Sequence, residues 1–228
     1  MDDEKSATPK APRKPATKPK APRKLSARYL ENAALHYLKR FAATEAGLRR
    51  VLMRKVDRSL RAHEGDRAEA QGWVDELVRK LVRNGLVNDA AFAEQKAQSL
   101  RASGRSARVI AMKLKQKGVP EAVAAPKLRE VTHEISEEDA ARTWARKKRL
   151  GPFRRDDALR LKRGESESDA RRAQRQRDLA ALARAGFSFD IARRVIDAPA
   201  PSGGQAGSPF GDYRDDVEFD PDSDVDVD

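Results

Sequence analysis

The sequence contains no cysteine, which excludes disulfide scaffolds, thiolate zinc sites and cysteine nucleophiles. Aromatic residues make up only 5% of its 228 residues, which is little for one compact globule but sufficient for slender helical units. No apolar run approaches the roughly 20 residues that a membrane span needs. The N-terminus begins Met-Asp-Asp-Glu, unlike a signal peptide. We therefore expect a soluble cytoplasmic protein with no membrane contact.

The sequence also lacks the short motifs that several classes of enzyme need. It has no phosphate-binding glycine loop followed by Lys-Ser/Thr, and no Gly-x-Ser-x-Gly nucleophile elbow. His36, His63 and His133 are scattered without the spacing of metal ligands. The acidic residues within 165–169 lie in a polar stretch that would not hold metal ligands rigidly. We expect no catalytic residue, no metal and no cofactor.

Positive charge is what the sequence has in excess. The formal net charge is +12 and the pI is about 10.1, which favours a polyanionic partner. The charge is uneven: residues 1–24 carry eight basic and three acidic residues, whereas residues 201–228 carry one basic and nine acidic residues. Residues 1–26 are predicted to be a disordered basic tail rich in Lys, Pro and Ala, and residues 199–228 a disordered acidic tail.

The acidic tail suggests a hypothesis of its own. Asp212 to Asp228 would fold back on the basic middle of the chain and compete there with its partner. The alternative is that the tail only keeps a basic protein soluble.

Between the tails, the apolar period is helical throughout. In one stretch, apolar residues recur at three- and four-residue steps: Val74, Leu77, Val78, Leu81 and Val82. Gly85 should end this helix, and Leu86 should fold back on its last turn. Asn88 or Asp89 should cap the next helix, which carries Phe92 inward.

The second half of the chain repeats part of the first. Setting Leu114 against Leu182 aligns Gly118 with Gly186 without a gap, and the following apolar positions stay in step. Helical repeats stack because one unit cannot bury its apolar face alone. We predict an all-α protein of three tandem three-helix repeats. Their expected bounds are 27–87, with a polar insertion at 57–71, then 88–132, and then 137–198.

Three segments in the middle of the chain form a recognisable set: Gly-Leu-Val-Asn-Asp-Ala-Ala-Phe-Ala at 85–93, Ser-Leu-Arg-Ala-Ser-Gly-Arg-Ser-Ala-Arg at 99–108 and Leu-Lys-Gln-Lys-Gly-Val at 114–119. Together they resemble the central signature of the RecX family, regulators of the RecA recombinase. Residues 37–55 look like that family's first repeat, and the resemblance covers about residues 29–197. The chain departs from the pattern at Val56, where a Gly is lacking, and in the polar stretch 163–169.

This resemblance implies an elongated, curved array of three-helix repeats that lies in the groove of a RecA filament on DNA. There it would restrain filament growth, ATP hydrolysis, strand exchange and the coprotease role of RecA, in DNA repair and the SOS response. The implied partners are the RecA filament and single-stranded DNA, with double-stranded DNA as a further nucleic-acid partner. The chain is expected to be a monomer.

Basic residues gather once in each predicted repeat and are candidate contacts with the filament or DNA. They are Arg49, Arg50, Arg54 and Lys55 in the first, Arg101, Arg105, Arg108, Lys113, Lys115 and Lys117 in the second, and Arg149 and Arg154 in the third. The alternative is a set of solvated, solubilising helix surfaces. Arginine also binds carboxylates of protein partners, so these patches do not distinguish DNA from RecA.

Other functions stay open from the residues alone. A general nucleic-acid-binding chromosomal protein would need only the basic tail and the high pI, and a structural adaptor would ignore nucleic acid. Trp73 and Trp144 are interpreted as core anchors, because no interleaved aromatic surface of the kind found in single-strand binders surrounds them.

Overall fold

The computed structural model describes residues 23–154 and 166–199, and both predicted tails lie almost wholly outside this range. Within it the chain forms nine α-helices, one short 3-10 helix and no strand, so the all-α prediction is confirmed. None of these helices combines the length and the apolar character needed to cross a bilayer.

The first unit is built from three helices that each begin at a side-chain cap. Ser26, Thr44 and Asp66 each accept a backbone N–H from the first turn that follows. The helices are α1 (Ala27–Arg40), α2 (Glu45–Leu60) and α3 (Arg67–Arg83). Only 61–66 lie between α2 and α3, where the sequence suggested an insertion over 57–71.

The second and third units follow the same plan. The second contains α4 (Asp89–Ala102), α5 (Ala107–Lys117) and α6 (Glu121–Glu134), and Pro126 lies inside α6, which continues to its end. The third contains α7 (Glu137–Lys148), the 3-10 helix η1 (Gly151–Phe153), α8 (Glu167–Arg184) and α9 (Phe189–Ile196). Each unit has its own cluster of buried apolar side chains, within residues 25–87, 92–131 and 140–196.

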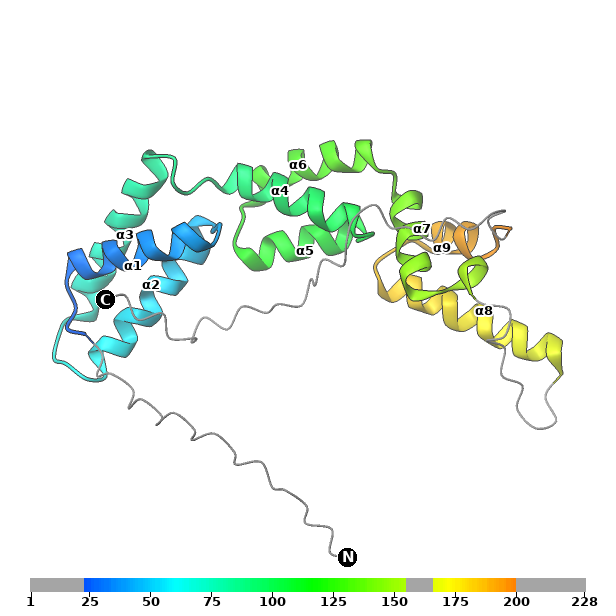
Figure 1. Cartoon of the computed structure of the whole chain (residues 1–228), viewed down its shortest axis with the longest axis horizontal. Helices are drawn as coiled ribbons and strands as arrows, with labels where there is room; N and C mark the ends of the chain where they lie inside the picture. Colours follow the sequence, from blue (N-terminus) through cyan, green and yellow to red (C-terminus); the bar gives the residue numbers. More distant parts are fainter. Residues whose placement is uncertain (1–22, 155–165, 200–228) are drawn as a thin grey trace, which may run out of the picture.

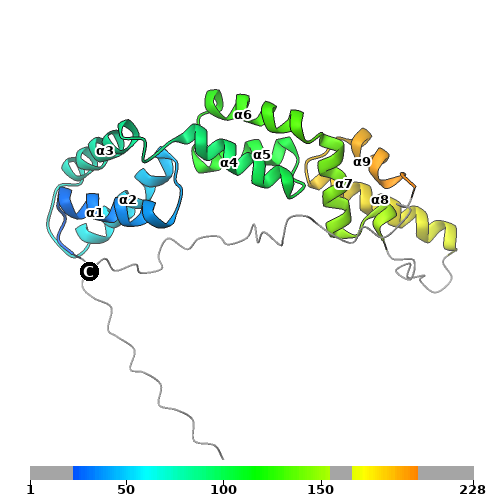
Figure 2. The same ribbon diagram turned by 45° about the horizontal axis from the view of Figure 1, so that its top comes forward.

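The units lie side by side in chain order and form an elongated, curved array (Figure 1). The third helix of each unit, α3, α6 or α9, lies along the outer side of the curve, and the second helix, α2, α5 or α8, lies along the inner side (Figure 2). The inner side therefore includes three helices that hold the same place in successive units.

The turns after α5 and α8 confirm the alignment of the two repeats. Gly118 and Gly186 end their helices with φ of 85° and 88°, in the left-handed region that glycine adopts without steric cost. The next residue, Val119 or Phe187, is 5% exposed and donates its N–H to the carbonyl of a fully buried leucine, at 3.1 and 3.2 Å. Each turn thus closes its helix and returns an apolar side chain to the core.

The turn after α3 differs from expectation in one residue. Gly85 ends the helix with φ of 71°, as predicted, but Leu86 is 52% exposed. The buried residue is Val87, 2% exposed, which packs in the first core. Asn88 then caps α4 by accepting two backbone N–H groups at 3.0 Å, and Phe92 packs on the second core.

Successive units are joined by the same hydrogen bond at both junctions. The hydroxyl of Thr44, the cap of α2, donates to the carbonyl of Lys117 at 2.6 Å, and the hydroxyl of Ser106, the cap of α5, donates to that of Ala185 at 2.8 Å. In both cases the acceptor immediately precedes the left-handed glycine of the next unit. Both hydroxyls are buried, Thr44 at 2% and Ser106 at 0% exposure. A buried polar side chain therefore connects each pair of neighbours.

A second hydrogen bond is also shared by the two junctions. The backbone N–H of Glu45, at the start of α2, donates to the carboxylate of Asp89 at 2.8 Å, and that of Ala107, at the start of α5, donates to the carboxylate of Glu137 at 3.1 Å. Each carboxylate belongs to the first helical residue of the next unit, and a negative charge at a helix N-terminus is favourable. The same two hydrogen bonds thus position the second unit on the first and the third unit on the second.

Candidate functional site

Positive charge is concentrated on the inner side of the array. The helices α2, α5 and α8 together hold fourteen Lys and Arg against five Asp and Glu. The outer helices α3, α6 and α9 hold eight basic against seven acidic residues. The inner side therefore presents positive charge in every unit, whereas the outer side is close to neutral.

The helix α5 provides the most accessible part of this surface. It contains no acidic residue, and Arg108, Lys115 and Lys117 are exposed, with Lys113 half-buried. Within the part of the chain that the structure describes, none of these four side chains forms an ion pair. Their charge is thus available to a partner.

The basic residues of α2 divide into two groups. The Arg49 guanidinium donates to Asp75 at 2.7 Å and to Glu45 at 3.2 Å, and hydrogen bonding to Asp75 raises the pKa of Arg49 above its usual value. Arg50 is used at the first junction, where it donates to the carbonyls of Gln116 and Lys117 at 3.3 and 3.1 Å.

The two remaining candidates of α2 differ in exposure. Arg54 is exposed and has no ion pair among the described residues, and Lys55 is half-buried. Burial raises the pKa of the nearby Tyr37, and the positive charges of Arg54 and Arg50 oppose that shift. Arg54 is therefore the residue of this set best placed to meet a ligand.

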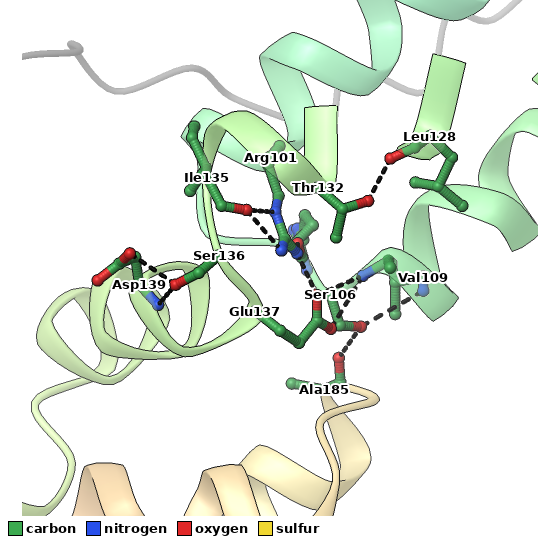
Figure 3. Close-up of polar contacts among 12 residues, drawn as sticks. Arg101, Ser106, Val109, Leu128, Thr132, Ile135, Ser136, Glu137, Asp139 and Ala185 are labelled. Atoms are coloured by element: carbon green, nitrogen blue, oxygen red, sulfur yellow. Dashed lines mark hydrogen bonds and ion pairs between the residues drawn. The ribbon is translucent and has the colours of Figure 1, made fainter. Parts of the chain in front are cut away.

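Arg101 is not on the surface, and this removes it from the candidate interface. Its side chain is 1% exposed and donates to the carbonyl of Ile135 at 2.9 and 2.8 Å and to the carboxylate of Glu137 at 2.5 Å (Figure 3). The guanidinium also donates a hydrogen bond to the carbonyl of Arg105 at 3.2 Å. Arg101 thus links the second unit to the start of the third.

Arg105 also lies at this junction, and Arg101, Arg105 and Arg108 do not belong to one helix. The reason is that α4 ends at Ala102 and α5 begins at Ala107. The Arg105 guanidinium stacks over the ring of Trp144, 4.6 Å from its centroid. Trp144 itself packs on the third core, and Trp73 packs on the first, as expected of core anchors.

In the third unit, Arg149 is exposed, whereas Arg154 is bound within the fold. One nitrogen of Arg154 contacts both carboxylate oxygens of Asp178, at 2.6 and 2.8 Å. Asp178 is 4% exposed as a side chain and also accepts the N–H of Gly151 at 2.9 Å and an amide of Gln174. This buried carboxylate therefore holds the turn of η1 against α8.

Replacing Asp178 with alanine should destabilise the third unit by about 2–3 kcal/mol, because the Gly151 N–H and the Arg154 guanidinium lose a buried acceptor. The chain has two tryptophans, and Trp144 reports on this unit alone in a Trp73→Phe background. Urea unfolding followed by Trp144 fluorescence measures the loss. The matched variant Asp190→Ala, which removes an exposed carboxylate from α9, should change stability by no more than about 0.5 kcal/mol. Equal effects of the two variants would contradict this role of Asp178.

The sequence analysis missed the basic residues of α8. Arg172, Arg177 and Arg184 are exposed and have no ion pair among the described residues, unlike Arg175, which donates to Asp197 at 2.7 Å. This hydrogen bond lowers the pKa of the Asp197 carboxyl. The pairing of Leu114 with Leu182 equates α8 with α5 as helices, but in that register the basic positions of α5 fall on Gln176, Ala181, Ala183 and Ala185. These arginines could therefore be found only from the assignment of α8 as a surface helix.

No group of three potential metal ligands occurs in the described residues. An array of three-helix units that presents positive charge along its inner side, and joins its units through buried side chains, is a helical-repeat protein.

Comparison with known proteins identifies the family. Residues 88–126, at the second unit, match the family model described as the second three-helix domain of RecX. The chain is 63% identical over 180 residues to the regulatory protein RecX of Myxococcus xanthus, covering 79% of this chain and 90% of that protein. It is 31% identical over 168 residues to the regulatory protein RecX of Agrobacterium fabrum, covering 74% and 82%. The chain belongs to the RecX family of regulatory proteins, which agrees with the expectation of a non-catalytic function.

Solved structures show the same fold. A crystal structure of RecX from Lactobacillus salivarius matches with a TM-score of 0.50 at 24% identity, over 75% of this chain and 94% of that one. A second crystal structure of regulatory protein RecX matches with a TM-score of 0.51 at 21% identity, over 75% and 72% of the two chains. The elongated helical array is thus a fold already seen in this family.

Proposed function

We propose that this protein binds along a RecA filament on DNA and restrains it, lowering filament growth, ATP hydrolysis, strand exchange and coprotease activity. It would act in the cytoplasm as a monomer, in DNA repair and the SOS response. The specific activities follow from the resemblance to RecX, and the structure supplies a surface on which they could depend.

The observation that carries the proposal is the repetition of accessible positive charge along the inner helices. Arg54 on α2, the four basic residues of α5 and Arg172 on α8 each lie on the second helix of their unit. A long polyanion meets such a series at several points, and each neutralised phosphate releases condensed counterions. A small ligand would use only one of these points.

The proposal is tested by RecA-dependent ATP hydrolysis on single-stranded DNA, titrated with this protein below the recombinase concentration. Affinity for the same DNA without RecA is measured in parallel. Suppression at substoichiometric amounts, with weaker binding to bare DNA, is the expected result. Tight binding to bare DNA without suppression would instead favour a general chromosomal nucleic-acid-binding protein, and no binding to either would favour a structural adaptor.

Removing two charges from α5 should weaken this action. In the double variant Arg108→Ser/Lys115→Ser, inhibition of ATP hydrolysis should require about tenfold more protein, because two exposed cations no longer meet phosphates. The slope of log affinity against log salt on single-stranded DNA should become shallower by about 1.4, at about 0.7 per phosphate.

A matched control removes the same charge from the outer side. Arg83 on α3 and Arg129 on α6 are exposed and have no ion pair among the described residues. The variant Arg83→Ser/Arg129→Ser should inhibit as the unmodified protein does. If both double variants lose the same activity, net charge and not the inner surface governs binding.

A further inference from the structure

Among the described helices that end in a left-handed residue, α7 is the one in which that residue is not glycine. Arg149 adopts φ of 55° and ψ of 51°, and it is the only residue other than glycine with a positive φ in residues 23–154 and 166–199. Corresponding left-handed positions after other helices hold glycine: Gly85, Gly104, Gly118 and Gly186. A side chain with a β-carbon is strained in this conformation, and glycine is not.

The turn requires the left-handed conformation but does not require arginine. After the reversal, Leu150 donates its N–H to the carbonyl of Ala145 at 2.9 Å and packs on the third core. The Arg149 side chain is exposed and makes no hydrogen bond or ion pair with any described residue. Packing therefore explains the backbone at this position, and it leaves the arginine side chain unexplained.

The preceding cations are held by contacts within the fold. Arg146 stacks over Phe153, with 5.2 Å between the guanidinium carbon and the ring centroid, and Lys148 lies 5.2 Å from the centroid of Trp144. Lys147 donates to the carbonyl of Ser103 at 3.2 Å. The Arg149 side chain, by contrast, makes no such contact with a described residue.

We propose that Arg149 binds a phosphate of the DNA backbone and that the protein keeps arginine at this strained position for that contact. Of the six basic residues in 140–154, Arg142 pairs with Glu138 and Arg154 with Asp178. The other four, at 146–149, form no ion pair among the described residues, and four adjacent cations favour a polyanion over an isolated carboxylate of a protein partner. A guanidinium binds phosphate through paired, charge-assisted hydrogen bonds. This proposal rests on one part of the proposed function, namely that the protein binds DNA. It does not depend on RecA.

The test compares stability with affinity in Arg149→Gly and Arg149→Asn, since glycine and asparagine both tolerate the left-handed conformation. Each variant should raise the melting temperature by about 2 °C, through relief of strain. Affinity for a fluorescently labelled single-stranded oligonucleotide, without RecA, should fall about tenfold. The salt slope should become shallower by about 0.7. Arg149→Lys keeps the charge and should retain part of the affinity.

The control is Arg129→Gln, which removes one exposed charge from the outer helix α6 without a change of backbone conformation. It should leave the melting temperature and the DNA affinity unchanged. Unchanged DNA affinity in Arg149→Gly, or a fall in its melting temperature, would overturn the proposal. A loss of affinity seen only with RecA-coated DNA would assign Arg149 to a protein carboxylate instead. Failure of the unmodified protein to inhibit RecA would contradict the proposed function and leave the bare-DNA result to decide on Arg149.

Discussion

Replacing Arg101 with methionine should lower the free energy of unfolding by about 3–5 kcal/mol, the cost of breaking a buried ion pair by removing one partner. The guanidinium is the largest fully buried side chain of the described residues, and it satisfies the carbonyls of Ile135 and Arg105 as well as Glu137. Methionine fills a similar volume but donates no hydrogen bond, so these acceptors lose their partner. Urea unfolding followed by circular dichroism measures the change.

The matched control for Arg101 is Arg108→Met, an exposed residue of the next helix with no ion pair among the described residues. It should change stability by no more than about 0.5 kcal/mol. A double-mutant cycle with Glu137→Gln measures the interaction energy between the two side chains, because the effects of each single substitution cancel in the cycle. A loss below about 1 kcal/mol in Arg101→Met would mean that the side chain is as replaceable as a surface arginine.

Replacing Gly118 with alanine should lower the free energy of unfolding by about 3 kcal/mol, since strain and a steric clash act together. The residue has φ of 85°, and a β-carbon there would lie 2.5 Å from that of Ala46 in the preceding unit. The first unit must then move away from the second. Urea unfolding measures the lost stability, and small-angle X-ray scattering should show a larger radius of gyration.

Two other glycines separate the causes of this effect. Gly72 lies inside α3 and Gly85 has φ of 71°, and a β-carbon at either would meet no atom within 4 Å. Gly72→Ala should stabilise the protein by about 0.5–1 kcal/mol, because alanine favours the helix. Gly85→Ala should cost about 1–2 kcal/mol through strain alone. If Gly118→Ala cost no more than Gly85→Ala, the close approach of the two units would be unsupported.

The order of helices was predictable from sequence because local signals specify it. Apolar periodicity gave the amphipathic helices, and the match of Gly118 with Gly186 gave equivalent turns, which the structure confirms. The exposure of Leu86 was not predictable in this way. After Gly118 and Gly186, the residue that packs inward is the next one in the chain. After Gly85 it is the second one, Val87. This choice depends on the path of the chain into the next unit.

The burial of Arg101 could not be predicted because its partners are distant in sequence. Its acceptors on Ile135 and Glu137 lie 34 and 36 residues later, and the sequence around Arg101 contains no pattern that predicts these contacts. An arginine at helical spacing from two others is typical of a solvated face. The resemblance to RecX then favoured an interface, and neither interpretation predicts a buried side chain. The accessible cations of α5 and α8 required only a correct assignment of helices, whereas the pairing of Arg154 with Asp178 required tertiary contacts.

The hydrogen bonds at the two junctions also make each unit depend on the unit that is synthesised after it. On the ribosome the first unit emerges before the second, so Thr44 and the Glu45 N–H face water until Lys117 and Asp89 have left the exit tunnel. Ser106 and Ala107 likewise wait for Ala185 and Glu137. Each newly made unit completes the one made before it, and a nascent chain released early would end in a unit whose cap is unfinished.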